Sequence, residues 1–211
     1  MIKKKLLSSL VGMLIIVSVS AQKQLYSINH LEDSLKKHKL VAILPLKVTI
    51  SYKRLPKGFD AEANKADEKK TGINMQEGMY TYLLRKSDDY FVSFQEVERT
   101  NTLLKKAGIF DRLDEVLPDS IALVLGVDAV IKATYSYEKT GSEAGAIVKT
   151  LVFGYGGSTG TGSLTMQINN GSSGLLLWRF YKEMNEGAFS SGNELMERMM
   201  RKVSRNFPYS K

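Results

Sequence analysis

The chain of 211 residues is 43% hydrophobic, contains no cysteine and carries a formal net charge of +8. This hydrophobic content is typical of a globular protein with a sizeable core, and the absence of cysteine excludes disulfide bonds, so stability must come from core packing. Lys3, Lys4 and Lys5 carry three of the positive charges, which leaves +5 for the rest of the chain. Because the other basic residues are scattered among acidic ones, we expect no nucleic-acid partner.

The first 21 residues have the pattern of a secretory signal peptide. A basic start precedes an apolar run, Leu6 to Ser18, which is too short to span a bilayer comfortably. Val19-Ser20-Ala21 then offers the small residues that a signal peptidase accepts. We expect export to the periplasm, to the outer membrane or beyond the cell. The predicted division is a signal peptide at 1–21, an N-terminal polar segment at 22–39 and a single α/β domain at 40–211.

The α/β domain begins with one predicted strand and an exposed connection. Leu40 to Leu46 is a continuous apolar run, and residues 47–52 continue it with period-two alternation, so together they predict a buried first strand. Residues 53–72 are charged and polar and include Pro56 and Gly58. This composition is typical of an exposed connection.

Three helices and a short strand are predicted next. Apolar residues recur at three- and four-residue spacing between Met75 and Arg85, which predicts an amphipathic helix. Residues 90–94 form a short predicted strand that leads into a helix at 96–107, ended by Gly108. Residues 117–125 predict a third helix, with Pro118 in its first turn and Gly126 after its end.

The second half of the chain is rich in predicted strands. Residues 127–137 form a strand whose first half is apolar and whose second half alternates. Ile147 to Phe153, Ser163 to Ile168 and Leu175 to Tyr181 are separated by Gly-rich or Asn-Gly turns, which predicts an antiparallel meander. A last helix is expected from Ser191 to about Arg205. The order of these elements predicts a single mixed sheet with an antiparallel C-terminal meander and helices packed on the sheet.

Four local patterns resemble a group of bacterial envelope proteins. Val41 to Leu46 is similar to the group's opening strand, Tyr90 to Arg99 to its second strand and following helix, Leu125 to Ile131 to a Gly, Asp-Ala, strand junction, and Gly174 to Trp178 to a later strand. This is the CsgG-like group of envelope proteins. It includes curli secretion-channel subunits, activators of penicillin-binding proteins and small lipoproteins that share the fold of the TolB amino-terminal domain. The resemblance implies an α/β sandwich without a catalytic centre, used for assembly or for contacting a partner.

The chain departs from this group in two respects. Many members are lipoproteins, whereas this chain lacks the cysteine that would carry the acyl chain. The channel-forming members also have long membrane-spanning hairpins, whereas the corresponding segment here, Ala144 to Met166, is compact and rich in glycine. These departures argue against a pore.

No residue pattern indicates a catalytic, metal or cofactor site. His30 and His38 lie in a polar segment without cysteine or a dense carboxylate cluster, so no metal site is predicted. The glycine-rich segment Gly154 to Gly162 lacks the Gly-Lys-Ser/Thr and dinucleotide fingerprints, so it favours a hairpin or loop over phosphate binding, with a contact loop as an alternative. Asp128 begins a buried strand, where hydrogen bonding to a neighbouring turn or helix is favoured over general-base catalysis. We therefore expect no cofactor.

Four residues are candidates for contact with a partner. Tyr155 lies in the glycine-rich segment, and Trp178 lies in a strand in which Leu176, Trp178 and Phe180 are predicted to share one face and Leu177, Arg179 and Tyr181 the other. A core position is the first interpretation of Trp178 and an interface anchor the second. Met196 and Met200 lie in the last helix, where packing on the sheet explains them as well as a partner surface does.

The leading functional hypothesis is an exported, non-enzymatic envelope protein that binds another envelope component as a scaffold or regulator. Its expected partner is a protein of the envelope or a second copy of the chain, and contact with a membrane surface stays open. The first alternative is a self-assembling ring or membrane-associated structural or secretion component that uses Ala144 to Met166. The second is an enzyme with an unfamiliar site, which has little support because metal ligands, cysteine and paired histidines are missing from the sequence.

Overall fold

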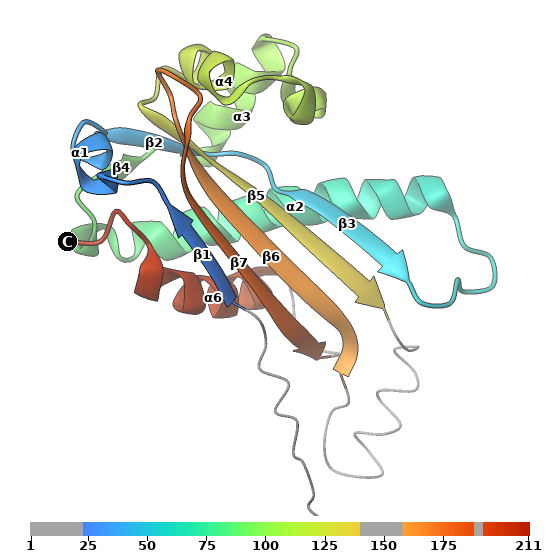
Figure 1. Cartoon of the computed structure of the whole chain (residues 1–211). Coiled ribbons are helices and arrows are strands. Elements are labelled where there is room, and N and C mark those ends of the chain that lie inside the picture. Colours follow the sequence, from blue (N-terminus) through green and yellow to red (C-terminus); the bar gives the residue numbers. More distant parts are fainter. Residues whose placement is uncertain (1–22, 140–157, 188–191) are drawn as a thin grey trace, which may run out of the picture.

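The computed structural model describes residues 23–139, 158–187 and 192–211, which form one seven-stranded mixed sheet with helices packed against it (Figure 1). The strands lie in the order β1, β7, β6, β5, β2 and β4, and β3 also pairs with β5. This architecture confirms the predicted mixed α/β fold. The strands are β1 (Lys23–Ser27), β2 (Leu40–Ile43), β3 (Lys47–Tyr52), β4 (Ser93–Phe94), β5 (Ala129–Lys139), β6 (Ser158–Asn170) and β7 (Leu176–Gly187); the helices are α1 (Leu31–Leu35), α2 (Ala61–Leu84), α3 (Val97–Lys106), α4 (Pro118–Leu125) and α6 (Gly192–Val203), with short 3-10 helices η1 (Ser87–Asp89), η2 (Phe110–Glu115) and η3 (Ser204–Asn206).

The C-terminal half of the sheet is the antiparallel meander predicted from the sequence. β5 pairs antiparallel with β6, and β6 pairs antiparallel with β7. The turn between β6 and β7 ends at Gly174, whose φ of 69° lies in the left-handed region that favours glycine. The predicted strand at 147–153 lies outside the described residues.

The predicted first strand is two strands, β2 and β3, separated by an interruption at Pro45. Both pair in parallel with β5, but the register shifts by one residue between them. Proline has no N–H to donate to a ladder. The Leu44 N–H still bonds to the Ile131 carbonyl of β5 at 3.0 Å, whereas the Leu46 N–H leaves the sheet and bonds to the Gly72 carbonyl of α2 at 3.2 Å.

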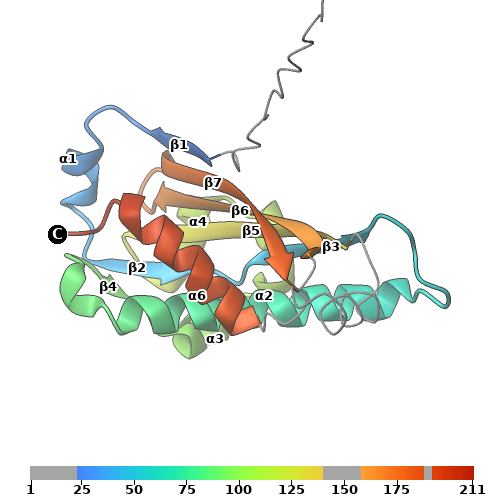
Figure 2. The same cartoon turned by 90° about the horizontal axis from the view of Figure 1, so that it is seen from below.

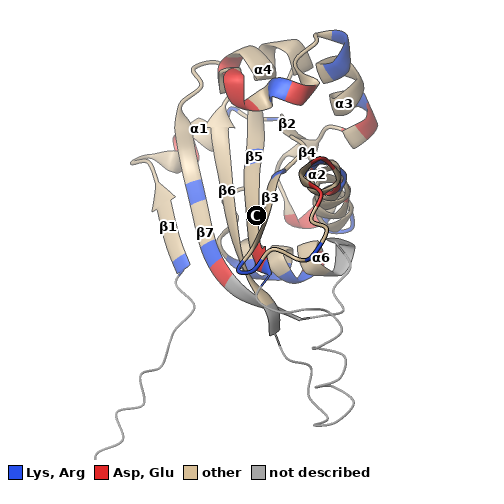
Figure 3. Ribbon diagram, turned by 90° about the vertical axis from the view of Figure 1, so that its right-hand side faces the viewer, with Lys and Arg blue, Asp and Glu red and all other residues tan. Residues whose placement is uncertain are grey.

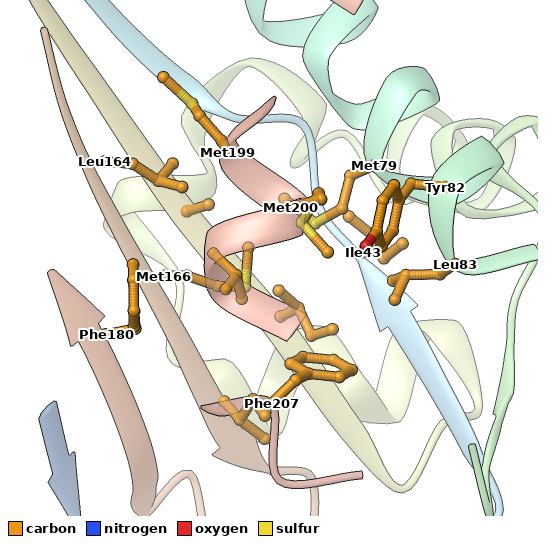
Figure 4. Packing of buried hydrophobic residues seen from close by; sticks show 14 of the residues in the cluster. Ile43, Met79, Tyr82, Leu83, Leu164, Met166, Phe180, Met199, Met200 and Phe207 are labelled. Carbon is orange, nitrogen blue, oxygen red and sulfur yellow. The ribbon is translucent and has the colours of Figure 1, made fainter. Parts of the chain in front are cut away.

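α2 and α6 lie side by side on one face of the sheet and cover it (Figure 2). The main core fills the space between this helical layer and the sheet. Figure 4 shows Met200 from α6 beside Met79 from α2, and it also labels Met199 of α6, Met166 of β6 and Phe180 of β7 in the same core. Flexible methionines fill the irregular gap between two helices and a twisted sheet.

α2 is much longer than the sequence predicted, and the expectation of an exposed connection across 53–72 was wrong from residue 61 onward. Asp60 caps the helix, because its side chain accepts hydrogen bonds from the N–H groups of Glu62 and Ala63. The first half of α2 has no apolar periodicity, so the pattern of the sequence did not predict a helix there. That half instead covers the outer edge of β3: Glu68 accepts the Ile50 N–H at 2.7 Å, and Asn64 donates to the Ile50 carbonyl at 3.1 Å.

α3 and α4 match their predicted positions and form a second, smaller core. Pro118 begins α4, and Gly126 ends it with φ 66°. Ala42 and Val130 point away from the main core because neighbouring residues of a strand face opposite sides. This second core lies between the helix pair and the sheet, and consists of Ala42, Leu44, Leu104, Ile109, Ile121, Ala122, Leu125 and Val130.

The polar segment before β2 forms two elements for which the sequence had given no sign. β1 adds to the edge of the sheet by antiparallel pairing with β7, and α1 follows it. At the opposite end of the strand order, β4 is shorter than the predicted strand at 90–94. The last helix, α6, occupies most of its predicted range.

Candidate functional site: a polar groove on the open sheet face

The face of β5, β6 and β7 that points away from α2 and α6 carries polar side chains. Lys132, Gln167 and Arg179 each lie between two core residues of their own strand, so their side chains point to this other face. The register places Lys132 opposite Gln167 and Gln167 opposite Arg179. These three residues, called the polar row below, therefore lie side by side across three strands.

The next row of the same face carries hydroxyl groups. Thr134 pairs with Thr165, and Thr165 pairs with Tyr181. The Tyr181 hydroxyl donates to a carboxylate oxygen of Glu183 at 2.7 Å. This hydrogen bond is the main reason that the pKa of Tyr181 is raised above its ordinary value, so the phenol stays protonated at neutral pH.

A groove of about 730 Å³ lies above these rows. The polar row, Thr134 and Thr165 form its floor, and its other wall comes from the segment that includes η2, with Phe110 and Leu113 among its lining residues. Lys47 of β3 and Lys69 of α2 line the side of the groove. The groove thus has a polar, hydrogen-bonding floor and a partly apolar wall.

Two lysines of the side wall are ion-paired, whereas the two cations of the floor are not. Lys47 forms an ion pair with Asp114 at 2.6 Å, and Lys69 forms one with Asp111 at 2.6 Å. Lys132 and Arg179 are both half-buried. Neither side chain forms a hydrogen bond or an ion pair with another residue that the structure describes. Figure 3 marks Lys and Arg positions in blue and an acidic position in red along the ribbon of β7.

The groove offers binding groups without a recognisable catalytic set. No histidine is among its lining residues. Asp111 and Asp114 are ion-paired, and Glu68 accepts a backbone N–H from β3, so these carboxylates are already engaged. Among the described residues, no group of three or more His, Asp or Glu side chains could hold a metal ion.

The predicted contact residues do not gather at this groove. Trp178 is 1% exposed, and its ring stacks on Phe180 in the main core. Met196 and Met200 belong to α6, and both side chains are fully buried. Tyr155 lies outside the described residues. For Trp178, Met196 and Met200 the sequence had allowed either a core position or a partner contact. Their burial agrees with a core position.

One expected alternation along β7 was wrong. Leu177 was expected to face away from Trp178, but it is buried in the main core as well. An irregularity in the pairing of β6 with β7 lies at this point, where Ile168 pairs with Trp178 and Asn169 with Leu176. A β-bulge of this kind adds one residue to β7, so that the Leu177 side chain points to the core as the Trp178 side chain does. From Arg179 onward the predicted alternation holds.

His38 and Asp128 lie near each other at a second polar location, which holds segments of the fold together. His38 is 4% exposed, and its Nδ1 lies 2.8 Å from the Tyr209 hydroxyl. Burial lowers the pKa of His38, although Asp128 opposes this shift, and burial raises the pKa of Tyr209. Asp128 accepts the N–H groups of Lys39 and Leu40 at 2.7 and 2.9 Å. Desolvation raises the pKa of Asp128, but these hydrogen bonds and nearby positive charge more than offset it and lower the pKa.

This arrangement agrees with the predicted role of Asp128 in bonding to a neighbouring turn. No hydrogen bond joins Asp128 to His38 among those of the described chain, so the two do not form a relay. The other histidine, His30, is exposed on α1 and lies 4.0 Å from Asp33.

Sequence reasoning missed the polar row. The predicted alternation of β7 did place Arg179 on the face opposite Trp178, but no face was predicted for Lys132. What the sequence did not show was the register that aligns them with Gln167, nor that η2 would stand over the same face.

Comparison with known proteins gives no family. No protein-family model and no curated protein sequence matches the chain. Similar solved structures include the lipoprotein GNA1162 from Neisseria meningitidis, at 15% identity and a TM-score of 0.40 over 79% of this chain and 94% of that one. A PelC dodecamer subunit from Paraburkholderia phytofirmans has 14% identity and a TM-score of 0.42 over 87% and 94%. The LpoB C-terminal domain from Escherichia coli has 10% identity and a TM-score of 0.35 over 74% and 93%.

These likenesses include a bacterial lipoprotein but are too distant to carry an argument about function. The resemblance to CsgG-like proteins therefore stays a prediction from the sequence motifs. Of the helices in residues 23–139, 158–187 and 192–211, none has the length and apolarity that crossing a membrane requires.

Proposed function

We propose that the protein is an exported, non-enzymatic component of the bacterial cell envelope that binds another envelope component through the groove, as a scaffold or regulator. The observation that carries this proposal is the asymmetry of the sheet. One face is sealed by α2 and α6, whereas the other presents a groove with two half-buried cations that lack partners among the described residues.

Export rests on the sequence of the first 21 residues. A basic start, a short apolar run and a small-residue ending are the features that direct a chain across the inner membrane. The proposed location is the periplasm or the periplasmic side of the outer membrane.

Binding is favoured over catalysis by the chemistry of the groove. Its floor consists of hydrogen-bond donors and hydroxyl groups, and the wall carboxylates Asp111, Asp114 and Glu68 are held by Lys69, Lys47 and the Ile50 N–H. A set of donors without an acid–base pair can position and hold a partner but has no means to activate a bond.

The proposal is tested by blocking the groove with a bulky neutral residue. Thr134 is exposed at the floor, so Thr134→Trp fills the groove without a change of charge. Thr102→Trp places the same side chain on the exposed face of α3 and is the matched control. In-cell crosslinking and pull-down of the tagged protein, with mass spectrometry of membrane and non-membrane fractions, should recover a specific envelope partner from the wild type and Thr102→Trp. A partner that Thr134→Trp also retains would contradict the proposal.

Self-assembly is a second candidate, favoured by the free edge of β1. Within the described part of the chain, β1 ends the strand order and pairs with β7 alone, and its Leu25 and Tyr26 are each 50% exposed. An unpaired strand edge is a template for another strand. By contrast, residues 158–166 of the segment expected to assemble lie in β6, which is paired on both sides.

The native mass in solution tests whether the protein self-assembles. Light scattering with and without detergent should give a multimer for the wild type and a smaller species for Leu25→Lys, because a charge at an edge strand opposes pairing. A monomer under both conditions would exclude self-assembly.

A further inference from the structure

We propose that the groove takes an acidic, extended segment of a partner protein, whose carboxylates bind the polar row Lys132, Gln167 and Arg179. This inference rests on the function proposed above and adds the chemical class of the ligand. It requires that the polar row act as one recognition surface and that the groove favour negative charge.

The spacing of the polar row fits carboxylates that are distributed along a chain. Neighbouring strands lie about 4.8 Å apart, so the backbones that carry Lys132 and Arg179 are separated by about 10 Å. In an extended segment, residues i and i+2 point to the same side and lie about 7 Å apart. Two long cationic side chains can therefore each reach one carboxylate of such a segment, while the Gln167 amide between them donates a further hydrogen bond.

The charge balance of the groove leaves these two cations for a ligand. Lys47 and Lys69 of the side wall are satisfied by Asp114 and Asp111, while Lys132 and Arg179 of the floor form no ion pair within the described chain. Both are half-buried, so a charge-assisted hydrogen bond to either is screened less than one at a fully exposed site. Arg179 adds the planar fork that matches a carboxylate with two parallel hydrogen bonds.

The wall opposite the polar row suits the aliphatic parts of a peptide. Ile73, Phe110 and Leu113 line the groove beside its charged floor. A peptide that alternates acidic residues with residues carrying a methyl group presents both kinds of surface at once. A small inorganic anion would use the floor and leave this wall without a partner.

The test measures the fluorescence anisotropy of a labelled peptide of alternating Glu and Thr, against a peptide with Gln in place of every Glu and the same dye. We expect the wild type to bind the acidic peptide only, with affinity that falls steeply between 0.05 and about 0.5 M salt. Lys132→Gln and Arg179→Gln should each weaken binding by about tenfold, since each removes a charge-assisted hydrogen bond. Arg205→Gln removes one exposed cation of η3, which follows α6 on the covered face, and should bind like the wild type.

Each other outcome overturns a stated part of the account. Acidic-peptide binding that survives both groove substitutions would show that the polar row is not the site. If wild type binds neither peptide although Thr134→Trp loses its partner in cells, the acidic class is wrong while the groove remains a binding site. Binding to phosphatidylglycerol vesicles that Lys132→Gln and Arg179→Gln abolish, without peptide binding, would assign the row to a lipid surface. The salt dependence of the wild type keeps the test decisive if a variant fails to fold, since salt-independent binding contradicts charge recognition.

Discussion

At the scale of single residues, the fold depends on a few buried polar side chains that the sequence did not distinguish from surface ones. Gln76 is fully buried in α2, donates to the Ile43 carbonyl at 2.7 Å and exchanges two hydrogen bonds of 3.0 Å with Asn101 of α3. Gln95 donates to the Leu125 carbonyl and accepts from Thr100. These amides join helices to strands at points where apolar contact alone would leave backbone groups unsatisfied.

Replacing Gln76 should therefore destabilise the protein strongly. Gln76→Leu leaves the Ile43 carbonyl and the Asn101 amide without partners, and each unsatisfied buried group costs about 1–3 kcal/mol. We expect the free energy of unfolding, measured by urea denaturation, to fall by about 2 kcal/mol or more. Asn74→Leu, at an exposed position of the same helix, should change it little. Equal effects of the two substitutions would contradict the structural role of the amide pair.

Buried His38 should make stability depend on pH. Burial lowers its pKa in the folded state below the ordinary value of 6.5, although Asp128 opposes the shift. The unfolded chain then binds the proton more readily, so the stability is full above about pH 6.5 and falls as the pH drops toward the folded-state pKa.

This prediction is checked by measuring the midpoint of urea denaturation at a series of pH values between about 7.5 and 5. His38→Gln keeps a neutral partner for Tyr209 and should flatten the dependence across this range. His30→Gln, at an exposed position, should retain the slope of the wild type. A wild-type slope in His38→Gln would show that another group is responsible.

At the scale of elements, the close approach of α2 to the sheet depends on Gly72. A Cβ at this position would overlap the Leu46 carbonyl, which belongs to the interruption between β2 and β3. Overpacking against backbone costs about 1–3 kcal/mol, more than the helix propensity that alanine adds. We expect Gly72→Ala to lower the free energy of unfolding by about 1–2 kcal/mol in urea denaturation, whereas Asn74→Ala should be neutral or slightly stabilising. A stabilised Gly72→Ala would mean that the helix stands further from the sheet.

The elements that the sequence predicted well are those with strong local patterns. α4 has proline at its start and glycine at its end, and the apolar residues of α6 fall four apart at Leu195, Met199 and Val203, all of them buried. The first half of α2 was missed because it is polar on every side and gains its stability from the cap at Asp60 and from bonds to β3. The sequence predicted one strand across Pro45, because the effect of this proline on pairing depends on β5, which lies more than 80 residues away.

At the scale of the whole molecule, the two faces of the sheet are covered differently: α2 and α6 seal one face, whereas α3 and α4 cover part of the other and leave the groove beside them. Trp178 and the methionines of α6, which stood out in the sequence, belong to the sealed face, where size and apolarity predict burial. The polar row did not stand out because Lys132, Gln167 and Arg179 are ordinary polar residues until register brings them together. Local patterns predict which face a side chain takes, whereas long-range pairing decides which side chains meet on that face.

The central claim is that the groove is where the partner binds, and site-specific photocrosslinking in cells tests it most directly. A photoreactive residue in place of Glu115 lies at the exposed rim of the groove, and one in place of Glu77 lies on the exposed side of α2, away from it. Because both positions are exposed glutamates, the two substitutions make the same change of charge. We expect a discrete partner adduct from position 115 and none from position 77. An adduct from position 77 alone would contradict the account and place the contact on the helical face.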